Sequence, residues 1–139
     1  MDPSRTSSPD AEDTSDASSS GLRVLVVEDV ADSRDALCEL LGLLGYAPVG
    51  AASGEAAFEC LQSQAFDVLL TDITLPGISG VELATRAVAQ WPGLRIVFAS
   101  GYGAPPALPF ESISLLKPYT TEHLEQALDG RAPASASRY

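Results

Sequence analysis

Five residues with side chains suited to metal and phosphate chemistry each follow a short apolar segment of this 139-residue sequence. They are the acids Glu28, Asp29 and Asp72, the hydroxyl of Ser100 and the only lysine, Lys117. Three carboxylates close together repel one another unless a cation joins them. Hard oxygen ligands that leave positions for water suit Mg²⁺. The residue types therefore predict a magnesium site.

The same residues favour phosphoryl transfer to a carboxylate. A carboxylate attacks phosphorus as a nucleophile, while a metal and a fixed cation neutralise the moving oxygens. We expect Asp72 to be the nucleophile, Glu28 and Asp29 to be metal ligands, and Ser100 and Lys117 to contact the phosphoryl oxygens. A single acid at the end of a strand is as often a helix cap as it is a functional residue. Three acids together with the only lysine are poorly explained by capping alone.

Apolar segments alternate with helix-patterned segments between residues 21 and 129. The predicted strands are 23–27, 46–51, 67–71, 95–99 and 112–116. The predicted helices are 31–44, a second helix that is capped by Ser53 and runs to residue 64, 79–91 and 120–128. Continuous apolar strands that alternate with helices indicate a parallel sheet covered on both faces. Right-handed connections then predict an α/β fold with five strands in the doubly wound order 2-1-3-4-5.

Such a sheet binds its ligands beyond the carboxyl ends of the strands, at the switch point beside the first strand. The five candidate residues all follow strands, so this order brings them to that edge. The segment 101–109 contains two glycines and three prolines. It therefore predicts a fourth helix that is shortened or irregular.

The two ends of the chain differ in composition from its centre. Residues 1–20 are rich in Ser and Asp without aromatic residues, which predicts a disordered acidic tail, and 130–139 predict a flexible one. The folded domain is expected at 21–129. The net charge of −11 disfavours nucleic acid as a partner. No apolar run approaches the roughly 18 residues of a membrane span, and no secretory signal is recognisable. We expect a cytoplasmic protein in which Cys38 and Cys60 are buried free thiols.

Four motifs resemble the receiver domain of bacterial response regulators. They are VLVVED (24–29), LTDITLPGISG (70–80), VFAS (97–100) and LKP (116–118). The resemblance covers nearly all of the predicted domain and implies a flavodoxin-like fold. It also implies that Asp72 is the phosphoacceptor, and that Glu28, Asp29, Asp72 and the backbone carbonyl of Thr74 hold Mg²⁺. Ser100 and Lys117 complete the implied site, and the Lys117–Pro118 bond is expected to be cis.

A narrower resemblance lies in FASGYG (98–103), LPF (108–110) and LLKPY (115–119). These segments are similar to a subfamily, common in alphaproteobacteria, that is named for a Phe-Ala-Thr-Gly-Tyr-like motif. The chain has Ser100 where that subfamily has Thr, which keeps the hydroxyl. For Tyr102, gating of water and simple packing are equally compatible with the sequence.

The resemblance also implies the partners. We expect a single-domain regulator, without an output domain, that receives its phosphoryl group from a histidine kinase or a phosphotransfer protein. It either docks as a monomer on a downstream protein target or acts as a phosphate sink, and the sequence leaves both open. Catalysis is expected only as Mg²⁺-dependent self-phosphorylation and autodephosphorylation.

Three alternatives fit the sequence less well. A phosphatase of the haloacid dehalogenase class requires a second Asp two residues after the nucleophile, where this chain has Thr74. A flavodoxin-like binding module requires a phosphate loop rich in Ser, Thr and Gly, whereas the first loop here reads EDVAD and repels phosphate without a metal. A degenerate receiver that acts only by interaction is disfavoured by the complete set of site residues.

Overall fold

The computed structural model describes residues 21–101 and 108–129, which form five strands and four helices. The strands are β2 (Arg23–Val27), β3 (Ala47–Ala51), β4 (Val68–Asp72), β5 (Arg95–Ser100) and β6 (Ile113–Leu116). The helices are α1 (Ala31–Leu43), α2 (Gly54–Ser63), α3 (Gly80–Gln90) and α4 (Thr121–Leu128). The two predicted tails lie outside the described residues.

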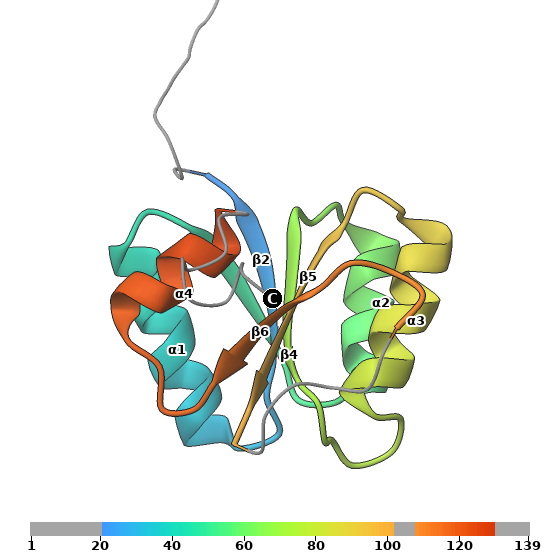
Figure 1. Cartoon of the computed structure of the whole chain (residues 1–139), viewed down its shortest axis with the longest axis horizontal. Coiled ribbons are helices and arrows are strands. Elements are labelled where there is room, and N and C mark those ends of the chain that lie inside the picture. Colours follow the sequence, from blue (N-terminus) through green and yellow to red (C-terminus); the bar gives the residue numbers. More distant parts are fainter. Residues whose placement is uncertain (1–20, 102–107, 130–139) are drawn as a thin grey trace, which may run out of the picture.

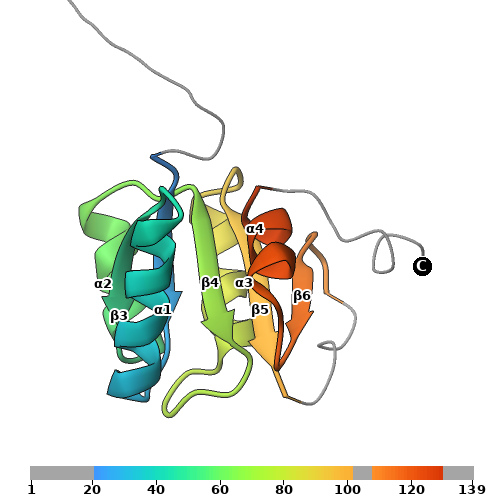
Figure 2. The same ribbon diagram turned by 90° about the vertical axis from the view of Figure 1, so that its left-hand side faces the viewer.

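All strands are parallel and follow the order β3-β2-β4-β5-β6 (Figures 1 and 2). This is the order 2-1-3-4-5 that the sequence predicts, and the doubly wound fold is confirmed. The predicted short or irregular fourth helix falls mostly on residues 102–107, outside the described part. The neighbouring residues 108–112, which are described, contain no helix.

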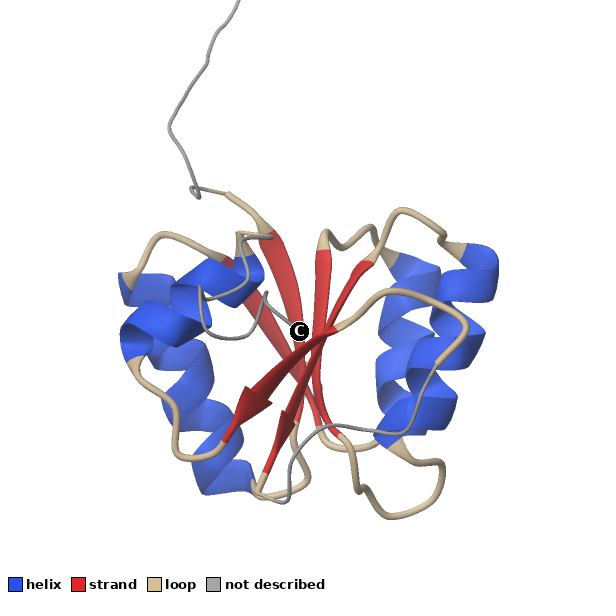
Figure 3. Cartoon of the chain, viewed as in Figure 1, coloured by secondary structure: helices blue, strands red, loops and turns tan. Residues whose placement is uncertain are grey.

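Helices cover both faces of the sheet, with α2 and α3 on one side and α1 and α4 on the other (Figure 3). Alternate residues of β2 supply the two cores, because side chains of a strand point to opposite faces in turn. Leu25 and Val27 are buried under α2 and α3, whereas Val24 and Val26 are buried on the face of α1 and α4. The sheet is therefore a layer that is mainly apolar on both faces, with Thr71 of β4 as a buried polar residue.

Side-chain caps start three of the helices. Ser53, Ser79 and Thr120 accept hydrogen bonds from the backbone N–H groups of residues 56, 82 and 123. Because a capping residue lies outside the helix, α3 and α4 each begin one residue later than the sequence pattern predicted. In the described residues, no helix is long and apolar enough to cross a membrane.

Candidate functional site

The carboxyl edge of the sheet brings four of the predicted site residues together. Asp72 and Ser100 are the last residues of β4 and β5, while Glu28 directly follows β2 and Lys117 directly follows β6. The parallel register keeps these strand ends level with one another. The strand order explains this convergence, because β2, β4, β5 and β6 are successive neighbours in the sheet.

Three carboxylates form an acidic cluster at this edge. Glu28, Asp29 and Asp72 each offer an oxygen, and these oxygens all lie within 4.8 Å of one another. Glu28 and Asp72 are half-buried and Asp29 is exposed. Mg²⁺ binds oxygens at about 2.1 Å and commonly keeps several waters. Three carboxylate oxygens this close together are a donor set that fits such an ion, with waters at its remaining positions.

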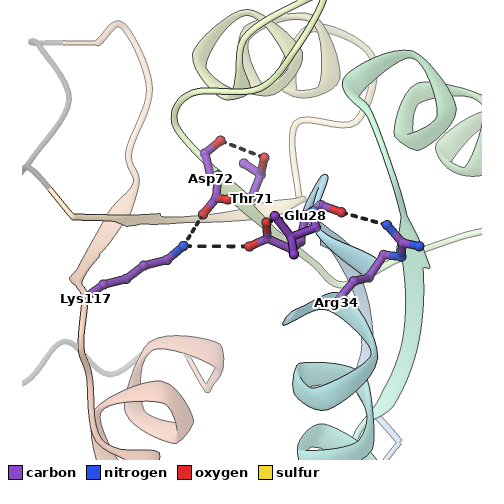
Figure 4. Close-up of polar contacts among 6 residues, drawn as sticks. Glu28, Arg34, Thr71, Asp72 and Lys117 are labelled. Carbon is purple, nitrogen blue, oxygen red and sulfur yellow. Dashed lines mark hydrogen bonds and ion pairs between the residues drawn. The ribbon is translucent and has the colours of Figure 1, made fainter. Parts of the chain in front are cut away.

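The side chain of Lys117 points toward the carboxylates of Asp72 and Glu28 (Figure 4). Its Nζ lies 2.7 Å from Asp72 Oδ1 and 3.7 Å from Glu28 Oε1. Burial lowers the pKa of Lys117, but the hydrogen bond and charge of Asp72 and the charge of Glu28 outweigh it, so the pKa is raised. Burial, followed by the neighbouring Asp72, raises the pKa of Glu28. The ammonium therefore stays protonated at neutral pH and offsets part of the negative charge.

Backbone contacts fix the start of the segment that carries the lysine. The N–H of Lys117 donates to the carbonyl of Ser100 at 2.7 Å, which joins the ends of β5 and β6. The Lys117–Pro118 bond is cis, as predicted. Ser100 itself is half-buried at the end of its strand. Ser100 and Lys117 are thus held next to each other at the ends of the adjacent strands β5 and β6.

The main chain of Asp72 is enclosed on two sides. Thr71, which is buried, donates its hydroxyl to the carbonyl of Asp72 at 2.9 Å. A Cβ atom built on Gly80 lies 1.8 Å from the same carbonyl oxygen, so the first residue of α3 packs directly against it. Thr74 lies two residues beyond Asp72 and is exposed, and its role as a carbonyl ligand stays a prediction.

Residues of α2 hold the loop between β4 and α3, which the sequence did not reveal. The carboxylate of Glu55 accepts a hydrogen bond from the N–H of Ile78 at 3.3 Å. Gly77 has a φ of +77°, and a Cβ there lies 2.6 Å from the same carboxylate. Gly54 leaves room for the side chain of Ile78. An acid in the first turn of a helix is ordinarily explained by the helix dipole. Nothing further in the sequence therefore indicated that Glu55 contacts this loop.

A cavity of about 600 Å³ adjoins the acidic cluster, between α1 and the residues that follow β6. Leu37 and Leu40 of α1 line it on one side, and Pro118 and Tyr119 line it on the other. Burial raises the pKa of Tyr119, so its phenol is neutral. The cavity continues the site with a mainly apolar wall.

Comparison with known proteins identifies the family. The model of the response regulator receiver domain matches residues 24–129. The chain belongs to this family. The receiver domain is 42% identical over 82 residues to the response regulator receiver protein CpdR of Brucella abortus, which spans 59% of this chain and 68% of that protein. It is 45% identical over 82 residues to the virulence sensor protein BvgS of Bordetella pertussis, and these make up 6% of that longer protein.

Solved structures show the same architecture. TrrA of Thermotoga maritima, crystallised with Mg²⁺ and BeF, superposes on the receiver domain with a TM-score of 0.71 and 26% identity. The match covers 78% of this chain and 97% of TrrA. The receiver domain of the hybrid histidine kinase CckA gives a TM-score of 0.68 and 29% identity, over 78% of this chain and 96% of its own.

Proposed function

We propose that this receiver domain accepts a phosphoryl group on Asp72 in a two-component phosphorelay. The observation that carries the proposal is the contact of Lys117 Nζ with Asp72 Oδ1 at 2.7 Å inside the acidic cluster. A carboxylate that is held between a cation and a potential metal site is prepared for attack on phosphorus, because the developing charge on the phosphoryl oxygens is already matched.

In this proposal the residues of the site act as metal ligands, as the nucleophile and as groups that bind the phosphoryl oxygens. Glu28, Asp29 and Asp72 hold Mg²⁺ together with the carbonyl of Thr74. The bound ion supplies positive charge to the oxygens of the transferred group. Asp72 attacks phosphorus, the bond to the donor atom breaks, and the donor leaves with its electron pair. Lys117 and Ser100 bind the phosphoryl oxygens. The reaction is self-phosphorylation followed by autodephosphorylation, in which water takes the phosphoryl group from the acyl phosphate and Asp72 returns to the free carboxylate.

The proposed donor is a histidine kinase or a phosphotransfer protein. TrrA, which shares the fold, has also been crystallised in complex with the histidine kinase ThkA. The proposed location is the cytoplasm, and the output is docking on a downstream protein or service as a phosphate sink. The narrower assignment to the subfamily with a Phe-Ala-Thr-Gly-Tyr-like motif rests on the segments 98–103, 108–110 and 115–119 of the sequence. Tyr102 and Gly103 of that motif lie outside the described residues.

Incubation with acetyl phosphate and Mg²⁺ tests the proposal directly. Intact-mass spectrometry is expected to show one added phosphoryl group, and hydroxylamine is expected to remove it as it does from acyl phosphates. Peptide mapping should place the group on Asp72. A group that resists hydroxylamine, or that maps to Ser100 or His123, would contradict the assignment.

Magnesium is expected to stabilise the folded receiver domain. Binding to the native state alone adds about 1.4 kcal/mol when the free ion is at ten times its Kd, because mass action favours the state that binds. This corresponds to a rise of several degrees in Tm. Thermal unfolding with MgCl₂ and with NaCl of equal ionic strength measures it. The NaCl control is essential because screening alone relieves carboxylate repulsion. Equal stabilisation by both salts would argue against the site.

Lys117→Ala is expected to slow phosphorylation by about tenfold or more, because a fixed cation no longer meets the phosphoryl oxygens. The same variant should bind Mg²⁺ more tightly, because the ammonium no longer competes with the ion for the carboxylates of Asp72 and Glu28. Arg86→Ala is the matched control: Arg86 is exposed on α3 and pairs with Glu82, away from the site. Labelling rates with acetyl phosphate and Mg²⁺ titrations measure both effects. A wild-type rate in Lys117→Ala would remove the lysine from the proposed chemistry.

A further inference from the structure

The turn between β2 and α1 presents two of the three carboxylates and is held at several points. The N–H of Glu28 donates to the carbonyl of Ala51 at 3.1 Å. The N–H of Val30 donates to the carboxylate of the same glutamate at 3.2 Å, and the N–H of Arg34 donates to the carbonyl of Val30 at 2.9 Å. The direction in which the acids point therefore depends on how well this turn is fixed.

Arg34 adds a contact that the functional assignment does not use. Its Nη1 donates to the carbonyl oxygen of Glu28 at 2.9 Å in a partly buried position. Lys117 and Arg34 approach Glu28 from opposite sides, one at its carboxylate and the other at its main chain (Figure 4). A cation near the N-terminus of a helix opposes the helix dipole, so the helix itself gives no reason for an arginine here.

Gly50 of β3 makes room for this side chain. A Cβ atom built on Gly50 lies 3.0 Å from both Cγ and Cδ of Arg34, closer than ordinary van der Waals contact. The aliphatic part of the arginine therefore lies flat against the glycine backbone. Glycine inside a strand costs stability and often marks a close approach of another group. Here the group that approaches is the arginine that reaches the metal turn.

We propose that Arg34 is a positioning residue for magnesium, and that it acts by holding the carbonyl of Glu28 so that Glu28 and Asp29 point at the ion. The inference rests on the proposed function of the acidic cluster. Groups that orient metal ligands from behind affect metal affinity strongly, by about 10- to 100-fold. Gly50 belongs to the same arrangement because any larger residue displaces the arginine stem.

The proposal makes a prediction of opposite sign to a simple charge effect. If Arg34 acts only as a nearby positive charge, its removal tightens Mg²⁺ binding, because one repulsion of the ion disappears. If it holds the turn, its removal weakens binding although the net charge becomes more favourable. Gly50→Ala changes no charge, so any effect it has on the metal arises from position alone.

Direct Mg²⁺ titration of full-length variants by calorimetry distinguishes the two. Arg34→Ala and Arg34→Met are each expected to bind about tenfold more weakly than wild type. The methionine keeps an aliphatic stem against Gly50 while it removes the donor. Gly50→Ala should fall between these variants and wild type. Arg86→Ala, the matched loss of an exposed arginine on α3, should stay within about twofold, because exposed charges are screened.

Amide hydrogen exchange of the metal-free chain gives a readout that does not depend on binding. In Arg34→Met the amide hydrogens of Asp29 and Val30 should exchange faster than in wild type, whereas in Arg86→Ala their exchange rates should be unchanged. Unchanged or tighter Mg²⁺ binding by both Arg34 variants would overturn the inference. So would weaker binding in Arg34→Ala together with wild-type affinity in Arg34→Met. If wild type itself binds no Mg²⁺, the proposed function fails as well, a result distinct from selective loss in the variants.

Discussion

Asp72→Asn is expected to abolish incorporation of a phosphoryl group from acetyl phosphate. An amide is not a nucleophile toward phosphorus, whereas its size and shape match those of the carboxylate. The variant should keep the fold, since Asp72 is a half-buried residue at the end of β4 and its main-chain contacts with Thr71 do not involve the carboxylate. Intact-mass spectrometry after incubation with Mg²⁺ measures the result.

Two further variants separate the nucleophile from the metal ligands. Asp35→Asn, an exposed position on α1, should label like wild type. Asp29→Asn should label slowly and recover at higher Mg²⁺, because it loses a ligand and keeps the nucleophile. Phosphoryl groups that remain on Asp72→Asn at the wild-type level would place the acceptor elsewhere. Failure of extra Mg²⁺ to help Asp29→Asn would argue against its role as a ligand.

Gly80→Ala is expected to be among the most damaging single substitutions in this domain. The new Cβ lies 1.8 Å from the carbonyl oxygen of Asp72, so either α3 or the end of β4 must move. Overpacking of this kind costs about 1–3 kcal/mol, and a clash with backbone places this position at or above the upper end. Phosphorylation should fall together with stability, because the displaced main chain carries the proposed acceptor.

Gly42→Ala provides a control of opposite sign. Gly42 lies in α1, and a Cβ there meets no atom within 4 Å. Alanine in a helix is favoured over glycine by about 0.5–1 kcal/mol, so this variant should gain stability. Urea unfolding of both variants at 25 °C measures the difference. A Gly80→Ala variant as stable as wild type would show that α3 is not seated against Asp72 as closely as described.

Strand order and strand-end residues were predictable because their signals are periodic. Continuous apolar runs mark buried parallel strands, and the handedness of the connections leaves few orders for five of them. Once the order is known, the acids that follow β2, the acid that ends β4 and the lysine that follows β6 must share an edge. The family resemblance added the assignment of individual roles and the cis bond at Lys117–Pro118, and the structure has that bond.

Contacts made by single side chains were not predictable in the same way. Arg34 and Glu55 both read as ordinary polar residues in the first turns of α1 and α2. Their partners are backbone groups of Glu28 and Ile78, and backbone atoms leave no trace in residue types. The glycines at 50 and 54 gave no clue to which side chain would lie against them. The thiols of Cys38 and Cys60 are free, as expected, but half-buried.

Because Lys117 is the only lysine among the 139 residues, its ammonium is a ready-made spectroscopic reporter. Protein grown with ¹⁵N- or ¹³C-labelled lysine gives one set of side-chain resonances. They come from a side chain whose Nζ lies 2.7 Å from Asp72 Oδ1. No assignment by mutagenesis is needed. Titration of the metal, arrival of a phosphoryl group and its loss can each be followed in real time at that one signal. A sequence with several lysines would hide the same event among overlapping peaks.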